Sequence, residues 1–127
     1  MTPIDHVGLT VSDMERAVAF YTAALGALGL DCLTDFTHEG RRHAGFGDKP
    51  PTFWISSLRD KPVGPAHVAF VAKSRAEVHA FYTIALSMGG RDNGKPGLRA
   101  HYHPDYYSAF VLDADGHNVE AVCHEPE

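Results

Sequence analysis

Three side chains of metal-binding types stand in strand-like stretches of the chain. His6 and His67 occupy equivalent places in an internal repeat, and Glu120 lies in an alternating stretch near the C-terminus. Two imidazoles and one carboxylate suit Zn, Fe, Mn or Ni, and three protein ligands leave positions for water or substrate. Such a site could act as a Lewis acid or serve a non-haem Fe(II) oxygenase. Each histidine could instead be an ordinary hydrogen-bonded strand residue.

The elements that would position these residues are encoded twice. Residues 4–31 and 65–92 align without a gap at an offset of 61 and are identical at ten of 28 positions. The identical pairs are His6/His67, Val7/Val68, Ala19/Ala80, Phe20/Phe81, Tyr21/Tyr82, Thr22/Thr83, Ala24/Ala85, Leu25/Leu86, Gly29/Gly90 and Asp31/Asp92. Such a repeat predicts a duplicated structural unit, and two copies are too few for a solenoid.

Each copy predicts a strand, a helix and then further strands. Period-two alternation opens both copies, and apolar residues at helical spacing follow. The helices should begin at capping boxes, Ser12–Glu15 and Ser74–Glu77, and end at Gly29 and Gly89–Gly90. Strands are expected near 31–38, 41–47 and 52–57, and near 106–112 and 118–124. The Asn93–Gly97 segment should break the chain, and Asp113–Gly116 should form a hairpin turn.

The pattern therefore predicts an α+β fold of two tandem βαβββ modules in a single domain. Module one should span 1–58, a linker 59–64, and module two 65–127. Helices gathered on one side of a mixed sheet leave its other side free for ligands. The repeated histidines should point to that free side.

The last strand has two unlike faces. The more apolar set suits the core, so Glu120 should share a cavity with the histidines. The polar face carries Asn118, Glu120, Val122 and His124, and the apolar face carries Val119, Ala121 and Cys123. Overlaying the turn and strand at 48–58 on 113–123 aligns Ile55 with Glu120, or Trp54 or Ser56 if the register slips. None of these is a strong metal ligand, so three ligands are expected rather than four.

Composition narrows the possible functions. The 127 residues are 44% hydrophobic and 21% charged, which is ordinary for a globular domain. A net charge of −5 argues against nucleic-acid binding. No apolar run approaches the roughly 18 residues of a membrane span, and the first residues lack a signal-peptide pattern. Two cysteines, Cys32 and Cys123, make no disulfide framework. We therefore expect a cytoplasmic protein with free thiols and no membrane partner.

Three segments, in order, resemble the vicinal oxygen chelate superfamily of glyoxalases, bleomycin-resistance proteins and extradiol dioxygenases. They are DHVGLTVSDMERAVAFY, AHVAFV and FVLDADGHNVEAV, and the resemblance covers essentially the whole chain. It implies a cupped half-barrel of paired modules, with helices on its outer face and a divalent metal on its floor. The family's ligand positions fall on His6, His67 and Glu120. Ile55 departs from the four-ligand glyoxalase I pattern, so the trio is closer to extradiol dioxygenases and fosfomycin-resistance transferases.

The resemblance implies two alternative functions. One is a metal-dependent enzyme of lyase, isomerase or dioxygenase type that chelates two oxygens of a small substrate. The other is a metal-free protein that sequesters a small molecule, as bleomycin-resistance proteins do. A homodimer is also implied, with modules paired within one chain or swapped between chains. In the swapped form one chain would supply His6 and the other His67 with Glu120.

Further candidates lie near the expected cavity. The catalytic candidates are Glu120, His124 and Tyr107, the last because strand parity with Ala109 and Val111 could bring it to the cavity. His124 could act as an acid or base, or form a simple strand-end hydrogen bond. His101, His103 and Tyr106 belong to the same HYHPDYY cluster as Tyr107. Phe53 and Trp54 should form core or cavity wall, and Tyr21 and Tyr82 should be packing residues. Cys123 should be a buried apolar residue.

Overall fold

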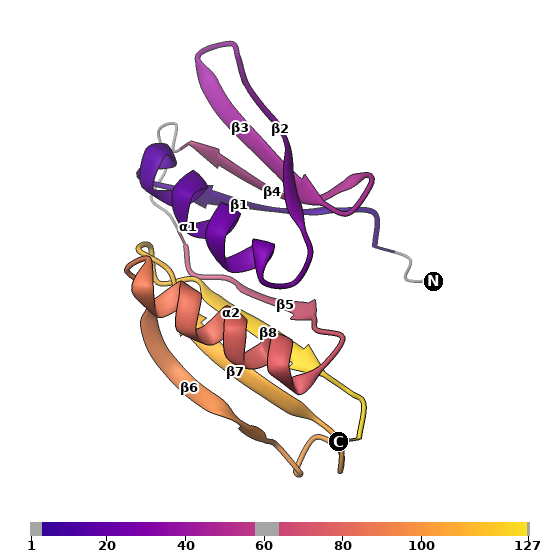
Figure 1. Ribbon diagram of the computed structural model, residues 1–127. Coiled ribbons are helices and arrows are strands. Elements are labelled where there is room, and N and C mark those ends of the chain that lie inside the picture. Colours follow the sequence, from indigo (N-terminus) through magenta and orange to yellow (C-terminus); the bar gives the residue numbers. More distant parts are fainter. Residues whose placement is uncertain (1–3, 58–63, 127) are drawn as a thin grey trace.

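The computed structural model describes residues 4–57 and 64–126. In chain order they form β1 (Val7–Val11), α1 (Met14–Gly26), β2 (Asp31–His38), β3 (Arg41–Gly47), β4 (Pro51–Ser57), β5 (His67–Val71), α2 (Arg75–Ser87), β6 (Arg91–Leu98), β7 (Tyr107–Leu112) and β8 (Asn118–Cys123). The predicted α+β fold of two βαβββ modules is confirmed (Figure 1). The predicted linker, except Gly64, lies outside the described residues.

Each module has its own four-stranded mixed sheet. The strand orders are β1-β4-β3-β2 and β5-β8-β7-β6. In both sheets the first strand runs parallel to the last, and the other neighbours are antiparallel. Figure 1 shows one module above the other, each with its helix lying across its sheet.

The helix-covered sides of the two sheets contribute to one hydrophobic core. Helices α1 and α2 contact each other. The ring of Phe53 in β4 lies 5.1 Å from that of Tyr21 in α1 and 5.0 Å from that of Phe70 in β5. The other side of each sheet, here called its open face, is therefore turned away from this shared core. The open face of the second sheet carries His67 and Glu120.

The first helix begins one residue later than its sequence predicts. Asp13 rather than Ser12 is the N-cap, and its carboxylate accepts a hydrogen bond from the Arg16 amide at 3.1 Å. Ser74 caps α2 as predicted, accepting from the Glu77 amide at 3.1 Å. Asp13 and Ser74 are equivalent at the repeat offset of 61, so the two helices begin at equivalent positions of the repeat, although the serines of the two capping motifs do not align.

The Asn93–Gly97 segment does not break the chain, contrary to the prediction. It lies inside edge strand β6, whose register against β7 shifts between Asp92 and Gly94 and again between Gly94 and Gly97. Glycine and proline are tolerated there because an irregular edge strand need not offer every amide to a neighbour.

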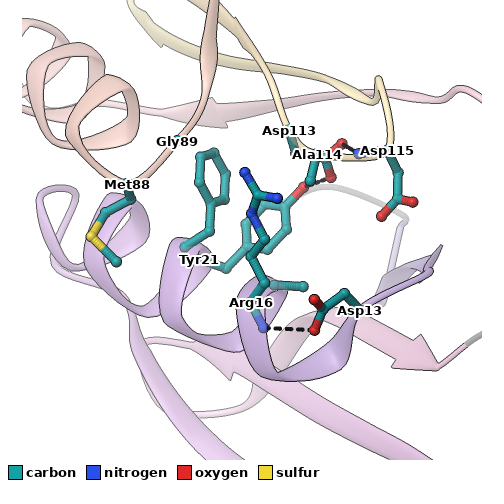
Figure 2. A pocket seen from close by; sticks show the side chains of 10 residues that line it. Asp13, Arg16, Tyr21, Met88, Gly89, Asp113, Ala114 and Asp115 are labelled. Carbon is teal, nitrogen blue, oxygen red and sulfur yellow. Dashed lines mark hydrogen bonds between the residues drawn. The ribbon is translucent and has the colours of Figure 1, made fainter.

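A polar joint connects the modules. The Tyr21 hydroxyl donates to the buried carboxylate of Asp113 at 2.6 Å, and Figure 2 shows the two side chains pointing toward each other. Nε2 of His117 lies 2.9 Å from the Thr10 carbonyl oxygen. Burial and the Asp113 carboxylate raise the pKa of Tyr21 far above its ordinary value. Tyr21 therefore packs and also anchors the Asp113–Gly116 turn, whose predicted hairpin is confirmed.

The remaining general predictions concern membranes and thiols. Within residues 4–57 and 64–126, no helix is long and apolar enough to cross a membrane. Cys32 and Cys123 are free thiols, and Cys123 is buried in the core, as its strand face predicts.

Candidate functional site

Strands β5 and β8 bring His67 and Glu120 together on the open face of the second sheet. The strands pair in parallel, with His67 opposite Asn118 and Ala69 opposite Glu120. Nε2 of His67 lies 2.9 Å from Oε1 of Glu120. The Glu120 side chain is 2% exposed and that of His67 is 51% exposed. A buried carboxylate therefore meets an imidazole that solvent or a ligand can reach.

The second carboxylate oxygen of Glu120 is held by Tyr106. The Tyr106 hydroxyl donates to Oε2 at 2.5 Å. Burial, with the Glu120 carboxylate beside it, raises the pKa of Tyr106 well above its ordinary value, so the hydroxyl remains a donor. Both oxygens of Glu120 thus have partners, as a buried carboxylate requires. The sequence placed Tyr106 in the HYHPDYY cluster but did not single it out.

Tyr107 does not line this face, contrary to the expectation. It pairs with Cys123 across β7 and β8 and lies on the helix-covered side. Its hydroxyl is 2.6 Å from Nε2 of His79 in α2, and the Arg75 guanidinium lies 4.7 Å from its ring centre. Ala109 and Val111 lie on this same side and are buried. The three residues therefore share one side of β7, as predicted, but that side faces the core and not the cavity.

His124 lies at the end of β8, beside Tyr106. Its ring is 5.2 Å from that of Tyr106, and its Nδ1 is 2.6 Å from Nε2 of His103. The His103 and His124 rings stack at 4.8 Å. The structure therefore connects His67, Glu120 and Tyr106 by hydrogen bonds and places the half-buried His103 and the exposed His124 beside them.

His6 stands apart from this cluster. It precedes β1 in the other sheet, its Nδ1 is 2.7 Å from Oδ1 of Asp5, and its side chain is 58% exposed. Among the residues that the structure describes, no three His, Cys, Asp or Glu side chains converge on a metal position. His67 and Glu120 have the donor chemistry and mutual contact of two metal ligands. The third predicted ligand does not join them within one chain.

Trp54, not Ile55, occupies the place equivalent to Glu120. Gly8 is the repeat equivalent of Ala69; Gly8 pairs with Trp54, whereas Ala69 pairs with Glu120. Ile55 is fully buried on the helix-covered side. The indole lies on the open face near the Phe36 ring, at 6.1 Å between centres. The one-residue alternative in the overlay is therefore the correct register, and module one presents an aromatic surface.

The enclosed cavity between the modules does not qualify as a ligand site. It is lined by Arg16, Tyr21, Met88, Asp113 and others (Figure 2), and its free volume is about 10 Å³. That volume is about enough for one water molecule.

Two tandem βαβββ modules, each with one helix on a four-stranded mixed sheet, define the fold class of this chain. Residues 3–121 match the family model of the Glyoxalase/Bleomycin resistance protein/Dioxygenase superfamily. The chain belongs to this superfamily, as its sequence motifs suggested.

Several solved structures share the fold of this chain. A glyoxalase/bleomycin resistance protein from Albidiferax ferrireducens T118 is 24% identical, with a TM-score of 0.77 over 96% of this chain and 99% of that one. Glyoxalase I from Zea mays is 24% identical, with a TM-score of 0.68 over 96% of this chain but only 46% of its own. A family enzyme from Burkholderia phytofirmans PsJN is 14% identical, with a TM-score of 0.71 over 98% of this chain and 100% of that one. No curated protein matches.

Proposed function

We propose that the protein is a divalent-metal-dependent enzyme whose metal is held by His67 and Glu120 of one chain and His6 of a second copy. Its substrate would be a small oxygen-bearing molecule, and its reaction of lyase, isomerase or dioxygenase type. The observation that carries the proposal is the buried Glu120 carboxylate in contact with the half-exposed His67 imidazole on an open face. Burying a carboxylate is costly, so its retention there favours a role in binding.

Each residue of the cluster has a defined part in this proposal. Nε2 of His67 and Oε1 of Glu120 already face each other and would be the donor atoms. Tyr106 holds the other carboxylate oxygen and so fixes the orientation of the ligand. A divalent ion, when bound, supplies a Lewis acid for substrate oxygens.

The need for a second copy follows from the separation of the open faces. His6 directly precedes β1 of one sheet and His67 begins β5 of the other, and the two sheets share a core through their helix-covered sides. A homodimer that sets the open face of module one against that of module two would bring His6 to the pair. Such a two-fold dimer would contain two equivalent sites.

The decisive experiment measures metal in protein purified without a histidine tag. After chelation and supplementation with Zn, Mn, Ni or Fe(II), we expect close to one equivalent per chain. His67→Ala, Glu120→Gln and His6→Ala should each lower the metal affinity by at least about tenfold. His38→Ala, at an exposed position of β2, is the matched control and should bind normally. Less than a tenth of an equivalent with all four metals would refute the proposal.

Mixing two inactive variants tests the shared site. His6→Ala and His67→Ala chains, unfolded and refolded together, would form mixed dimers that contain one intact site. Because half of the dimers are mixed and each restores one of two sites, about one quarter of the wild-type metal content should return. A site within one chain would recover none, and sedimentation as a monomer at micromolar concentration would also contradict the shared site.

A metal-free binding protein is the second candidate, and Trp54 is the observation that favours it. The half-buried indole and the exposed Phe36 ring form an aromatic surface on module one. Aromatic rings are common in the walls of small-molecule sites. If metal content is negligible while aromatic ligands quench Trp54 fluorescence, this function replaces the first.

A further inference from the structure

A cavity beside the Glu120 cluster occupies the open face of the second sheet. It is wide open to solvent, with a volume of about 550 Å³, and its lining includes Lys95, Arg99, Tyr102 and Phe110. Phe110 pairs with Glu120 across β7 and β8, and its ring lies 6.1 Å from that of His67. Phe110 therefore lies between the cavity, which it lines, and the proposed metal ligands, which it contacts.

Arg99 is held in this cavity without a carboxylate partner. Its guanidinium carbon lies 5.4 Å from the centre of the Phe110 ring, and Nη2 donates to the Lys95 carbonyl oxygen at 2.6 Å. In the part of the chain that the structure describes, no ion pair involves Arg99. An arginine that is stacked on a ring and has N–H groups to spare is well suited to bind an oxyanion.

The backbone of β6 leaves room for this arginine. A Cβ atom on Gly94 would lie 3.2 Å from Nη2 of Arg99 and 2.8 Å from Cδ1 of Phe110, and one on Gly97 would lie 3.3 Å from Nη1. These contacts are closer than ordinary van der Waals distances, so side chains at either position would displace the guanidinium. The glycines of the Asn93–Gly97 segment, which weaken a strand, thus have a physical role here.

The charge and shape of the lining indicate what would bind. Lys95 adds a second cation. Asp92 is the carboxylate among the lining residues, and it already accepts from the Gly94 amide at 2.9 Å and interacts with the Tyr82 hydroxyl. The rings of His101 and Tyr102, 4.3 Å apart, form an aromatic wall. The cavity therefore combines free positive charge with aromatic surfaces.

We propose that this cavity binds a small organic oxyanion with a flat apolar body. The anionic group would pair with Arg99 and the body would lie against Phe110 and Tyr102, with its far end toward Glu120. The inference rests on the proposed function for its meaning as a substrate site. Binding of the anion itself requires no metal, so the two proposals can fail separately.

Benzoate is a suitable probe, with benzamide as its neutral counterpart and acetate as an anion without the flat body. Chemical shifts of the Gly94 and Gly97 amides would be followed by NMR in untagged protein with excess chelator. We expect benzoate to bind at least about tenfold more tightly than either comparison ligand, with shifts centred on these amides. Equal binding of benzoate and benzamide would overturn the proposal.

Substitutions assign the interaction to Arg99. Arg99→Met should weaken benzoate binding by at least about tenfold, and Arg99→Lys should weaken it less because it keeps the charge but loses the planar fork. Arg91→Met, at the start of strand β6 and outside the cavity lining, should stay within about twofold of wild type. If both Arg99 variants bind benzoate like wild type, the proposal is wrong. If benzoate binds as expected but the separate metal-content measurement fails, only the metal-dependent function is refuted.

Discussion

The two modules have equivalent cores but different open faces. Phe20 and Phe81 stand at the same place in the repeat, and both are buried. At the place where module two has Glu120, held by His67 and Tyr106, module one has Trp54. Packing restricts the helix-covered side of each sheet, whereas the open face is free to take on different chemistry.

The largest expected effect concerns the equivalent tyrosines of the two helices. Tyr21 is fully buried and bonded to Asp113, whereas Tyr82 is only partly buried. Tyr21→Ala should lower the free energy of unfolding by about 3–5 kcal/mol, and Tyr82→Ala by no more than about half as much. Urea denaturation measures both. Equal losses would show that the two helices contribute alike and that the joint at Asp113 adds nothing.

The next effect concerns the hydrogen bond that holds Glu120. Tyr106→Phe leaves one oxygen of a buried carboxylate without its donor and should cost about 1–3 kcal/mol in the free energy of unfolding. Tyr102→Phe is the matched control, because that side chain is 59% exposed and the change should cost less than about 0.5 kcal/mol. Similar costs for the two variants would contradict the structural role assigned to Tyr106.

Alkaline pH should weaken the joint between the modules. Burial, with Asp113, raises the pKa of Tyr21, so the folded protein keeps a proton that the unfolded chain loses above about pH 10. The stabilisation is fully present below that pH and declines as pH rises. Between pH 10 and 11, Tyr21→Phe should reduce the slope of unfolding free energy against pH by up to about 1.4 kcal/mol per unit. An unchanged slope would be inconsistent with a protonated Tyr21.

The smallest effect probes the aromatic face of module one. A Cβ on Gly45 would lie 2.9 Å from the Trp54 ring, whereas one on Gly8 would meet Trp54 at an ordinary 3.8 Å. Gly45→Ala should shift the emission of the sole tryptophan and cost about 1 kcal/mol in stability. Gly8→Ala, which copies Ala69 of module two, should leave the emission unchanged. Matching spectra for both variants would show that Trp54 is not packed on Gly45.

Much of the fold could be predicted from local patterns. Alternation predicts strands, helical spacing predicts α1 and α2, and the repeat predicts two βαβββ modules, because these signals depend on neighbours in sequence. Edge strand β6 was missed because its glycines and proline resemble a loop. Only pairing with β7, through two register shifts, keeps them in the sheet.

The site depended on information that local patterns lack. A slip of one residue turns a strand side chain to the other face of the sheet. The sequence aligned Ile55 with Glu120 and favoured Tyr107 as a cavity residue. Only the strand pairing shows that Trp54 and Tyr106 hold these places. His67 and Glu120 lie on two strands of the same module, so their closeness could be predicted from the sequence.

The sequence alone determined that His6 and His67 are equivalent, since equivalence is a property of the repeat. Whether equivalent residues meet depends on how the modules pack, and packing is decided by long-range burial of apolar surface. Here the modules join through their helix-covered sides, so the two histidines belong to open faces that one chain does not bring together.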